Sequence, residues 1–118
     1  MQIEAHDRIV IELDPLASPR RQREVGAFVR YCVFRIEREF GELHWLVKLK
    51  PSRGGYSCSV TVTIANLIIE ARGQGLDAVF SAWDALSNTE QGLREAQVHR
   101  QVEQAGHLSG LKASANDG

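Results

Sequence analysis

Hydrophobic and polar residues alternate along the opening segment MQIEAHDRIVIEL. Ile9, Ile11 and Leu13 occupy every second position, which is the period of a strand with one buried face. We therefore predict a single first strand in this segment, with a bulge near His6 and Asp7.

The spacing changes to a helical period after the DPLASP segment. Ser18 is suited to cap a helix that begins at Pro19, because the missing N–H of proline costs nothing at the first helical position. Gly41 is expected to end this helix. One apolar stripe of the helix is predicted to face the core: Val25, Phe28, Val29, Cys32, Ile36 and Phe40, with Val33 at its edge.

Three further segments have the composition of strands. LHWLVKLK alternates again, YSCSVTVTI is rich in β-branched residues, and LIIEA follows a turn at Asn66. The RGQG segment that comes next is predicted to be a turn that leads into a second helix. The resulting β-α-β-β-β-α order predicts an α+β fold, in which two helices pack on one face of a four-stranded sheet.

The second helix is expected to weaken in its SNTEQG segment, which holds residues of low helix propensity. Its large apolar residues are predicted to form the buried stripe: Leu76, Val79, Phe80, Trp83 and Leu86. From Gly106 onward the residues are small, polar and aperiodic, so residues 106–118 are predicted to be a disordered tail. A single domain is expected over residues 1–105.

Length and composition limit the classes of protein that remain. The chain has 118 residues, of which 43% are hydrophobic and 25% charged, which suits one globular domain with a single core. The apolar stretches are too short to span a bilayer, and no secretory signal follows Met1, so we expect a cytoplasmic protein without a membrane partner. Cys32 and Cys58 have no pairing motif and are expected to be reduced and buried.

Catalytic and metal-binding patterns are weak. The histidines lack ligand spacing with cysteine or carboxylate, so no metal or other cofactor is predicted. GYSCS lacks the second glycine of a hydrolase nucleophile motif and precedes a strand. RGQG could cradle a phosphate before a helix, but it lacks the third glycine or the lysine of phosphate-binding loops, which favours a simple turn. No catalytic residue is predicted, and an enzyme is the least favoured class.

Charge is distributed unevenly along the chain. Residues 20–53 hold nine basic and four acidic residues, although the whole chain has a net charge of -1, and such asymmetry can orient an anionic partner. The outward face of the first helix combines guanidinium groups with aromatic rings: Arg20, Arg23, Arg30, Tyr31, Phe34, Arg35 and Arg38, diluted by Glu24 and Glu37. Lys48, Lys50 and Arg53 extend this face if the second strand lies beside it. Solvent exposure alone also produces charged helix faces.

Several segments together resemble the ribosome hibernation-promoting factor and ribosomal subunit interface protein family: MQIEAHDRIVIE, FRIEREFG and VTVTIANLIIEARGQGLDAVFSAWDAL. The resemblance covers roughly residues 1–95 and is most specific from Val60 to Leu86. It implies a fold similar to a double-stranded RNA-binding domain. It also implies binding in the decoding channel of the small ribosomal subunit, which blocks messenger and transfer RNA when growth slows, as in the short form of the family.

The resemblance also implies which side chains contact ribosomal RNA. The basic positions of the family's first helix and second to third strands are matched by Arg20, Arg23, Arg30, Arg35, Arg38, Lys48, Lys50 and Arg53. Tyr31 and Phe34 are candidate stacking groups among them. The family continues with a lysine-rich second helix, whereas this chain reads SNTEQGLREAQ, with Arg94 as the main basic residue. The chain is therefore a divergent match.

Two functional hypotheses follow from these patterns. The first is a non-catalytic ribosome-associated protein that binds small-subunit ribosomal RNA and modulates translation under stress. The second is a protein-interaction module that kept the fold and lost RNA binding. Its basic face would then pair with an acidic partner or, in a weak homo-oligomer, with an acidic surface of another copy.

Overall fold

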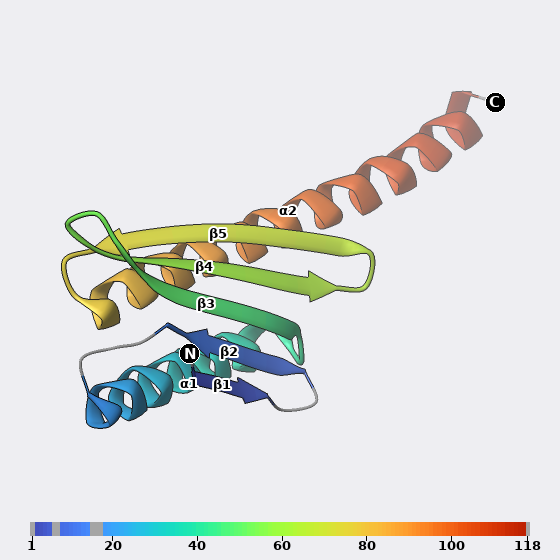
Figure 1. Ribbon diagram of the computed structural model, residues 1–118. Coiled ribbons are helices and arrows are strands. Elements are labelled where there is room, and N and C mark those ends of the chain that lie inside the picture. Colours follow the sequence, from blue (N-terminus) through green and yellow to red (C-terminus); the bar gives the residue numbers. More distant parts are fainter. Residues whose placement is uncertain (1, 6–7, 15–17, 118) are drawn as a thin grey trace.

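The computed structural model describes residues 2–5, 8–14 and 18–117, with side chains described from Arg8 to Asp14 and from Ser18 to His99. Its elements are β1 (Gln2–Ala5), β2 (Ile9–Leu13), α1 (Pro19–Phe40), β3 (His44–Ser52), β4 (Gly55–Ile64), β5 (Leu67–Gly75) and α2 (Ala78–Asp117). The strands form one sheet in the order β1-β2-β3-β4-β5. β2 and β3 are parallel, and the other neighbouring strands are antiparallel. Both helices lie behind this sheet in Figure 1.

The predicted α+β class is confirmed. Strands β2 to β5 form the four-stranded mixed sheet, and with α1 and α2 they follow the β-α-β-β-β-α order. The opening segment differs from the prediction of a single strand, because it forms β1 in addition to β2. β1 pairs antiparallel with β2 and adds a fifth strand at the edge of the sheet. The predicted bulge near His6 and Asp7 lies outside the described residues.

Alternate residues of the strands form the buried face of the sheet. The register places Ile11, Val47 and Val60 side by side across β2, β3 and β4, and each is at most 1% exposed. The predicted stripe of α1 packs in the same core: Val25, Val29, Cys32, Val33 and Ile36 are buried, and Phe28 and Phe40 are partly buried. Burying each large apolar side chain contributes roughly 1.5–3 kcal/mol, so this stripe is the main attachment of α1.

The two cysteines belong to this core. Cys32 and Cys58 are buried and unbridged, as predicted. Burial in apolar surroundings raises the pKa of the Cys58 thiol to about 12. Both thiols therefore act as small packing groups.

The ends of α1 are fixed as the sequence predicts. The Ser18 Oγ accepts a hydrogen bond from the Arg21 backbone N–H at 3.1 Å, and Pro19 occupies the first position of the helix. Gly41 has φ +85°, a conformation that favours glycine, and its N–H donates to the Glu37 carbonyl at 2.8 Å. These caps fix where α1 begins and ends, and its buried apolar stripe determines which residues face outward.

The Glu37 carboxylate joins the end of α1 to β2 and β3. Its Oε2 accepts from the Leu43 backbone N–H at 3.0 Å and from the Trp45 indole Nε1 at 3.1 Å, and it also pairs with Arg8. The Glu37 side chain is only 8% exposed. A buried charge is tolerated where several donors compensate it, so Glu37 is a structural anchor and not part of the outer face.

Small side chains attach α2 to β4 and β5. The buried residues of this helix are Ala78, Ser81, Ala82, Ala85, Leu86, Thr89 and Leu93. The predicted stripe of large residues is wrong for Leu76, Phe80 and Trp83, which are 87%, 54% and 46% exposed. The helix lies so close to β5 at Gly73 that large side chains do not fit between them.

The RGQG segment, predicted to be a turn, is the end of strand β5. It pairs with β4 through Gly75, which lies opposite Tyr56. A Cβ on Gly73 would lie 2.2 Å from the Ala85 backbone N and 2.5 Å from the Ser81 carbonyl O. The glycine is needed for the contact between strand and helix, and the extended segment cannot wrap around a phosphate as a loop would.

The polar SNTEQG segment does not interrupt α2. The Asn88 Nδ2 donates to the Arg72 carbonyl at 2.8 Å, and the Thr89 Oγ1 donates to the Ala85 carbonyl at 2.8 Å. The Asn88 bond holds the helix along the free edge of β5, whereas the Thr89 bond is made within the helix itself.

The helix continues through residues 106–117, where the sequence favours a disordered tail. That segment contains alanine, leucine and lysine, which favour a helix, but also two glycines, two serines, an asparagine and an aspartate, which have lower helix propensity. Forty helical residues span about 60 Å, and α2 extends well beyond the sheet (Figure 1). The domain boundary near residue 105 stays a prediction.

We expect Gly73→Ala to lower the free energy of unfolding by about 3 kcal/mol, because the added methyl group would collide with the backbone of α2. Urea denaturation measures this change. Gly54→Ala is the control, since Gly54 has φ +83° but open space around its Cβ position, so it should cost only about 1 kcal/mol in backbone strain. Equal losses in the two variants would contradict the close approach of α2 to β5.

Candidate nucleic-acid interface

The outer face of α1 carries the predicted arginines and aromatic rings on one surface. We call this surface the α1 face and define it by Arg20, Arg23, Arg30, Tyr31, Phe34, Arg35 and Arg38. Tyr31 is 65% exposed and Phe34 is 51% exposed. The arginines are exposed except Arg30, which is half-buried. The structure therefore brings the helical part of the predicted site together.

The arginines of the α1 face differ in their partners. Arg20 forms an ion pair with Glu24, with 3.2 Å between Nε and Oε1. Arg23 and Arg38 have no carboxylate partner among the residues that the structure describes. Exposed ion pairs contribute little free energy, so even Arg20 can exchange Glu24 for another anion. The α1 face thus presents positive charge that the fold itself does not require.

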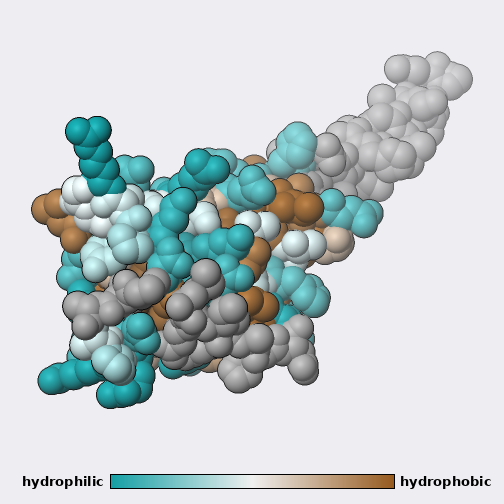
Figure 2. Space-filling view, in the orientation of Figure 1, coloured by the Kyte–Doolittle hydropathy of each residue, from teal (hydrophilic) through white to brown (hydrophobic). Residues whose placement is uncertain are grey.

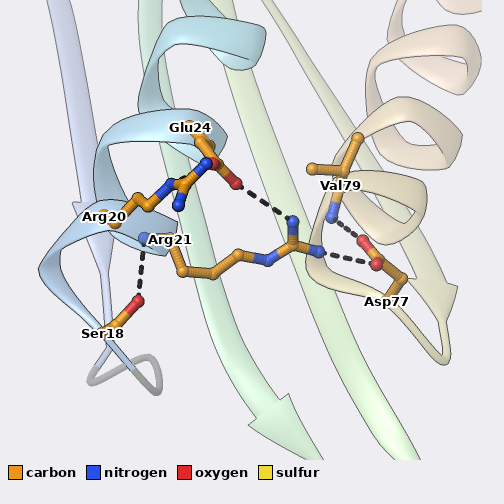
Figure 3. Close-up of polar contacts among 6 residues, drawn as sticks. All are labelled: Ser18, Arg20, Arg21, Glu24, Asp77 and Val79. Atoms are coloured by element: carbon orange, nitrogen blue, oxygen red, sulfur yellow. Dashed lines mark hydrogen bonds and ion pairs between the residues drawn. The ribbon is translucent and has the colours of Figure 1, made fainter.

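Arg21 connects the start of α1 to the start of α2, a role that the sequence did not indicate. Its Nη2 lies 2.6 Å from the Asp77 Oδ2, and its Nη1 lies 3.4 Å from the Glu24 Oε2 (Figure 3). The Asp77 Oδ1 accepts from the Val79 backbone N–H at 2.7 Å and so caps α2. This hydrogen bond, together with the charge of Arg21, holds the pKa of Asp77 below its ordinary value. The link fixes the first turns of both helices.

Lys48 and Lys50 lie on the opposite side of the sheet from the α1 face. Their neighbours Val47 and Leu49 are buried under the helices, and successive side chains of a strand point to opposite faces. Arg53 lies in the turn between β3 and β4. The structure therefore does not unite these three residues with the arginines of α1, and the predicted site is divided into two basic surfaces.

A hollow on the exposed face of the sheet, of about 300 Å³, contains the two lysines. We call it the open-face groove, and it is lined by Lys48, Lys50, Ser57, Cys58, Ser59, Arg72, Gly73 and Gln74. Figure 2 views this side of the molecule and shows hydrophilic side chains gathered over it. Arg72 and Gln74 were missed at the sequence level because RGQG was interpreted as a turn. Continuing the alternation of LIIEA by four residues would have placed both on this face.

The second helix adds little positive charge. Arg94 is the only arginine or lysine of α2 whose side chain the structure describes. Its Nη2 lies 3.2 Å from the Glu39 Oε2 and 3.6 Å from the Glu90 Oε2. The ion pair with Glu39 ties α2 to α1, so Arg94 is engaged within the fold.

Exposed apolar side chains gather where α1 meets the start of α2. Phe80 and Trp83 lie with their ring centroids 5.7 Å apart, and both are about half exposed. They line a shallow groove of about 650 Å³ with Phe28, Val79 and the Arg21–Asp77 ion pair. Exposed apolar surface of this kind is typical of contact regions, and it borders the α1 face.

Other kinds of site find no support in the described part of the chain. It contains no group of three or more histidine, cysteine, aspartate or glutamate side chains that could hold a metal ion. None of its helices combines the length and the apolar character that crossing a membrane requires.

Among solved structures, the chain is similar to the N-terminal domain of Protein Y from Thermus thermophilus, known from a crystal structure. The TM-score is 0.59 and the sequence identity 17%, and the match covers 72% of this chain and 92% of that chain. At this identity the likeness shows the fold alone. No protein-family model and no curated protein matches the sequence.

The link between Arg21 and Asp77 predicts a dependence of stability on pH. Because the pKa of folded Asp77 is lowered from 3.8, its charge stabilises the fold above that pH, and the stabilisation is lost as pH falls through the folded pKa. Asp77→Asn keeps a capping oxygen but has no charge, so we expect it to be less stable than the parent protein at pH 7. Urea unfolding at several pH values should show this difference shrinking below about pH 4. A difference that stays constant down to pH 2 would contradict the role of the Asp77 charge.

Proposed function

We propose that this protein is a non-catalytic, ribosome-associated module that binds small-subunit ribosomal RNA through the α1 face and modulates translation. The observation that carries the proposal is the composition of that face, where arginines, among them the exposed Arg23 and Arg38, lie beside exposed rings. The resemblance of the sequence to ribosome hibernation-promoting factors supports it. The fold similarity to the N-terminal domain of Protein Y is consistent with it.

The side chains of the α1 face suit RNA better than an anion that has no bases. The planar guanidinium of arginine forms paired hydrogen bonds with phosphate oxygens and also stacks on bases. Tyr31 and Phe34, which project among the arginines, offer flat surfaces for unpaired bases. Phosphate contacts then supply salt-dependent affinity, and the rings favour RNA whose bases are unstacked.

The α1 face and the open-face groove lie on opposite sides of the sheet, and this limits the kinds of RNA site that could contact both. A flat RNA surface could contact only one of them at a time, because the sheet lies between the α1 face and the open-face groove. The decoding channel that the family resemblance implies would surround the domain, and RNA could contact both surfaces there. A role in hibernation under stress is the corresponding physiological proposal.

Replacing two of the arginines without carboxylate partners, Arg23 and Arg38, tests the electrostatic part of this proposal. We expect Arg23→Ala/Arg38→Ala to lower affinity for purified small ribosomal subunits at least about tenfold, and to flatten the dependence of log affinity on log salt by about two units. Co-sedimentation over a salt series measures both quantities. The control Asn66→Asp/Gln97→Glu changes the net charge by the same amount at exposed positions elsewhere. Similar losses in the two double variants would reject a specific role of the α1 face.

Removing the rings tests the stacking part separately. Tyr31→Ala/Phe34→Ala should weaken binding at least about tenfold, because stacking contributes about 1–3 kcal/mol per base, while the salt dependence stays that of the parent protein. The matched variant Tyr31→Phe/Phe34→Tyr keeps both rings and should bind normally. If the alanine variant binds as the parent does, the rings do not contact RNA.

The engagement of Arg94 with Glu39 and Glu90 favours a second candidate function, a protein-interaction module without RNA affinity. In that case α2 contributes no available arginine or lysine among its described side chains, and the α1 face pairs with an acidic protein surface. Salt-sensitive self-association without binding to ribosomal subunits would favour this candidate. A monomer that binds the subunits would exclude its self-pairing form.

A further inference from the structure

We propose that the open-face groove is a phosphate-binding site for a phosphate group of single-stranded RNA or of a free nucleotide. The RNA source rests on the proposed function, whereas the anion site itself does not. The site combines two predicted residues, Lys48 and Lys50, with side chains of β4 and β5 to which no role has been given above.

The side chains that line the groove carry positive charge only. Its lining includes Lys48, Lys50 and Arg72 and no carboxylate. Lys48 has an acidic partner, Glu12, whose Oε2 lies 4.0 Å from the Lys48 Nζ. Lys50 and Arg72 have no carboxylate partner among the described residues. Like charges that are close together repel one another, so an anion placed among them is favoured.

The register of the sheet arranges the lining residues in two neighbouring rows. One row across β3, β4 and β5 is Lys50, Ser57 and Gln74, and the adjacent row is Lys48, Ser59 and Arg72. Neighbouring strands lie about 4.8 Å apart, and positions two residues apart on a strand are about 6.6 Å apart. Long cationic side chains at the borders of such an array can therefore reach one group held above its centre.

The residue types in these rows also determine the shape of the open-face groove. Serine is short, and both serines stand in β4 between long side chains of β3 and β5. The centre of the array is consequently hollow, with hydroxyl groups at its floor and cationic groups at its borders. Ser57, Ser59 and Gln74 add neutral donors that can bind the remaining oxygens of a tetrahedral anion. The volume of about 300 Å³ lies at the lower end of the range for small-molecule sites.

The next row of the same face lacks these properties. It consists of Val10, Leu46, Thr61 and Glu70, and Ile68 beyond it is 62% exposed. The combination of cations and short hydroxyl residues is thus confined to one end of the sheet. A general requirement for a soluble surface would not restrict it in this way.

The test is a titration of isotope-labelled protein, followed by NMR, with three probes: inorganic phosphate, uridine 5′-monophosphate and a 5′-phosphorylated uridine trinucleotide. We expect the backbone amide signals of Ser57, Ser59 and Gln74 to shift with each probe. Lys50→Ala/Arg72→Ala should weaken phosphate binding at least about tenfold, because two charge-assisted hydrogen bonds are lost. Lys50→Gln/Arg72→Gln, which keeps more of each side chain, should show the same loss.

A matched control separates this site from the α1 face. Arg23→Ala/Arg38→Ala changes the net charge equally on the other side of the sheet, and it should leave the phosphate-induced shifts of Ser57, Ser59 and Gln74 unchanged. Shifts that are absent, or that are equal in the parent protein and in both open-face variants, would overturn the proposal. Failure of ribosome binding with intact phosphate binding would instead reject only the proposed function.

The three probes also distinguish the sources of the phosphate. Trinucleotide binding that is at least about tenfold tighter than monophosphate binding would identify an RNA site, because neighbouring phosphates and bases then add contacts. Equal affinity for the two would identify a nucleotide site that does not use the rest of an RNA chain. Either result supports an anion site in the groove.

Discussion

The close approach of α2 to β5 at Gly73 determines how this protein is assembled. Because there is no room for a Cβ at that position, the helix presents alanine, serine and threonine to the sheet. Phe80 and Trp83 are displaced to the flanks and remain half exposed, whereas Leu86 and Leu93 are buried. The helix then runs along the free edge of β5, and its polar groups satisfy backbone groups of that strand.

The same constraint divides the charged surface. With α2 and α1 on one side of the sheet, the other side is left uncovered (Figure 1). The arginines of α1 point away from the sheet on the helical side, and Lys48, Lys50 and Arg72 lie on the uncovered side. A chain with a net charge of -1 thereby keeps two separate basic surfaces, while its acidic residues are used in links such as Arg21–Asp77 and Arg94–Glu39.

Local signals in the sequence predict much of this structure. The caps at Ser18 and Gly41 and the apolar stripe between them define α1 because they depend only on neighbouring residues. The alternation of apolar and basic residues in β3 also predicts that the two basic surfaces are separate. Helices cover the apolar side of a sheet, so Lys48 must lie opposite Val47 and away from α1.

What the sequence could not provide are distances between layers. The rule that large apolar residues are buried fails for Phe80 and Trp83 because the separation of α2 from the sheet is a property of the whole fold. Glu37 was interpreted as an outer residue for the same reason, since only the packed structure brings Arg8 and Trp45 to its carboxylate. The RNA-binding role of the α1 face is still a proposal, because exposure and charge are also properties of ordinary solvated helices.

The most direct test of the central claim is co-sedimentation of the unmodified protein with purified small ribosomal subunits over a series of salt concentrations. We expect binding at low salt that falls steeply as the salt concentration rises, because the contacts are made to phosphate groups. Absence of binding even at the lowest salt concentration would contradict RNA binding by the α1 face and assign the arginines to another partner.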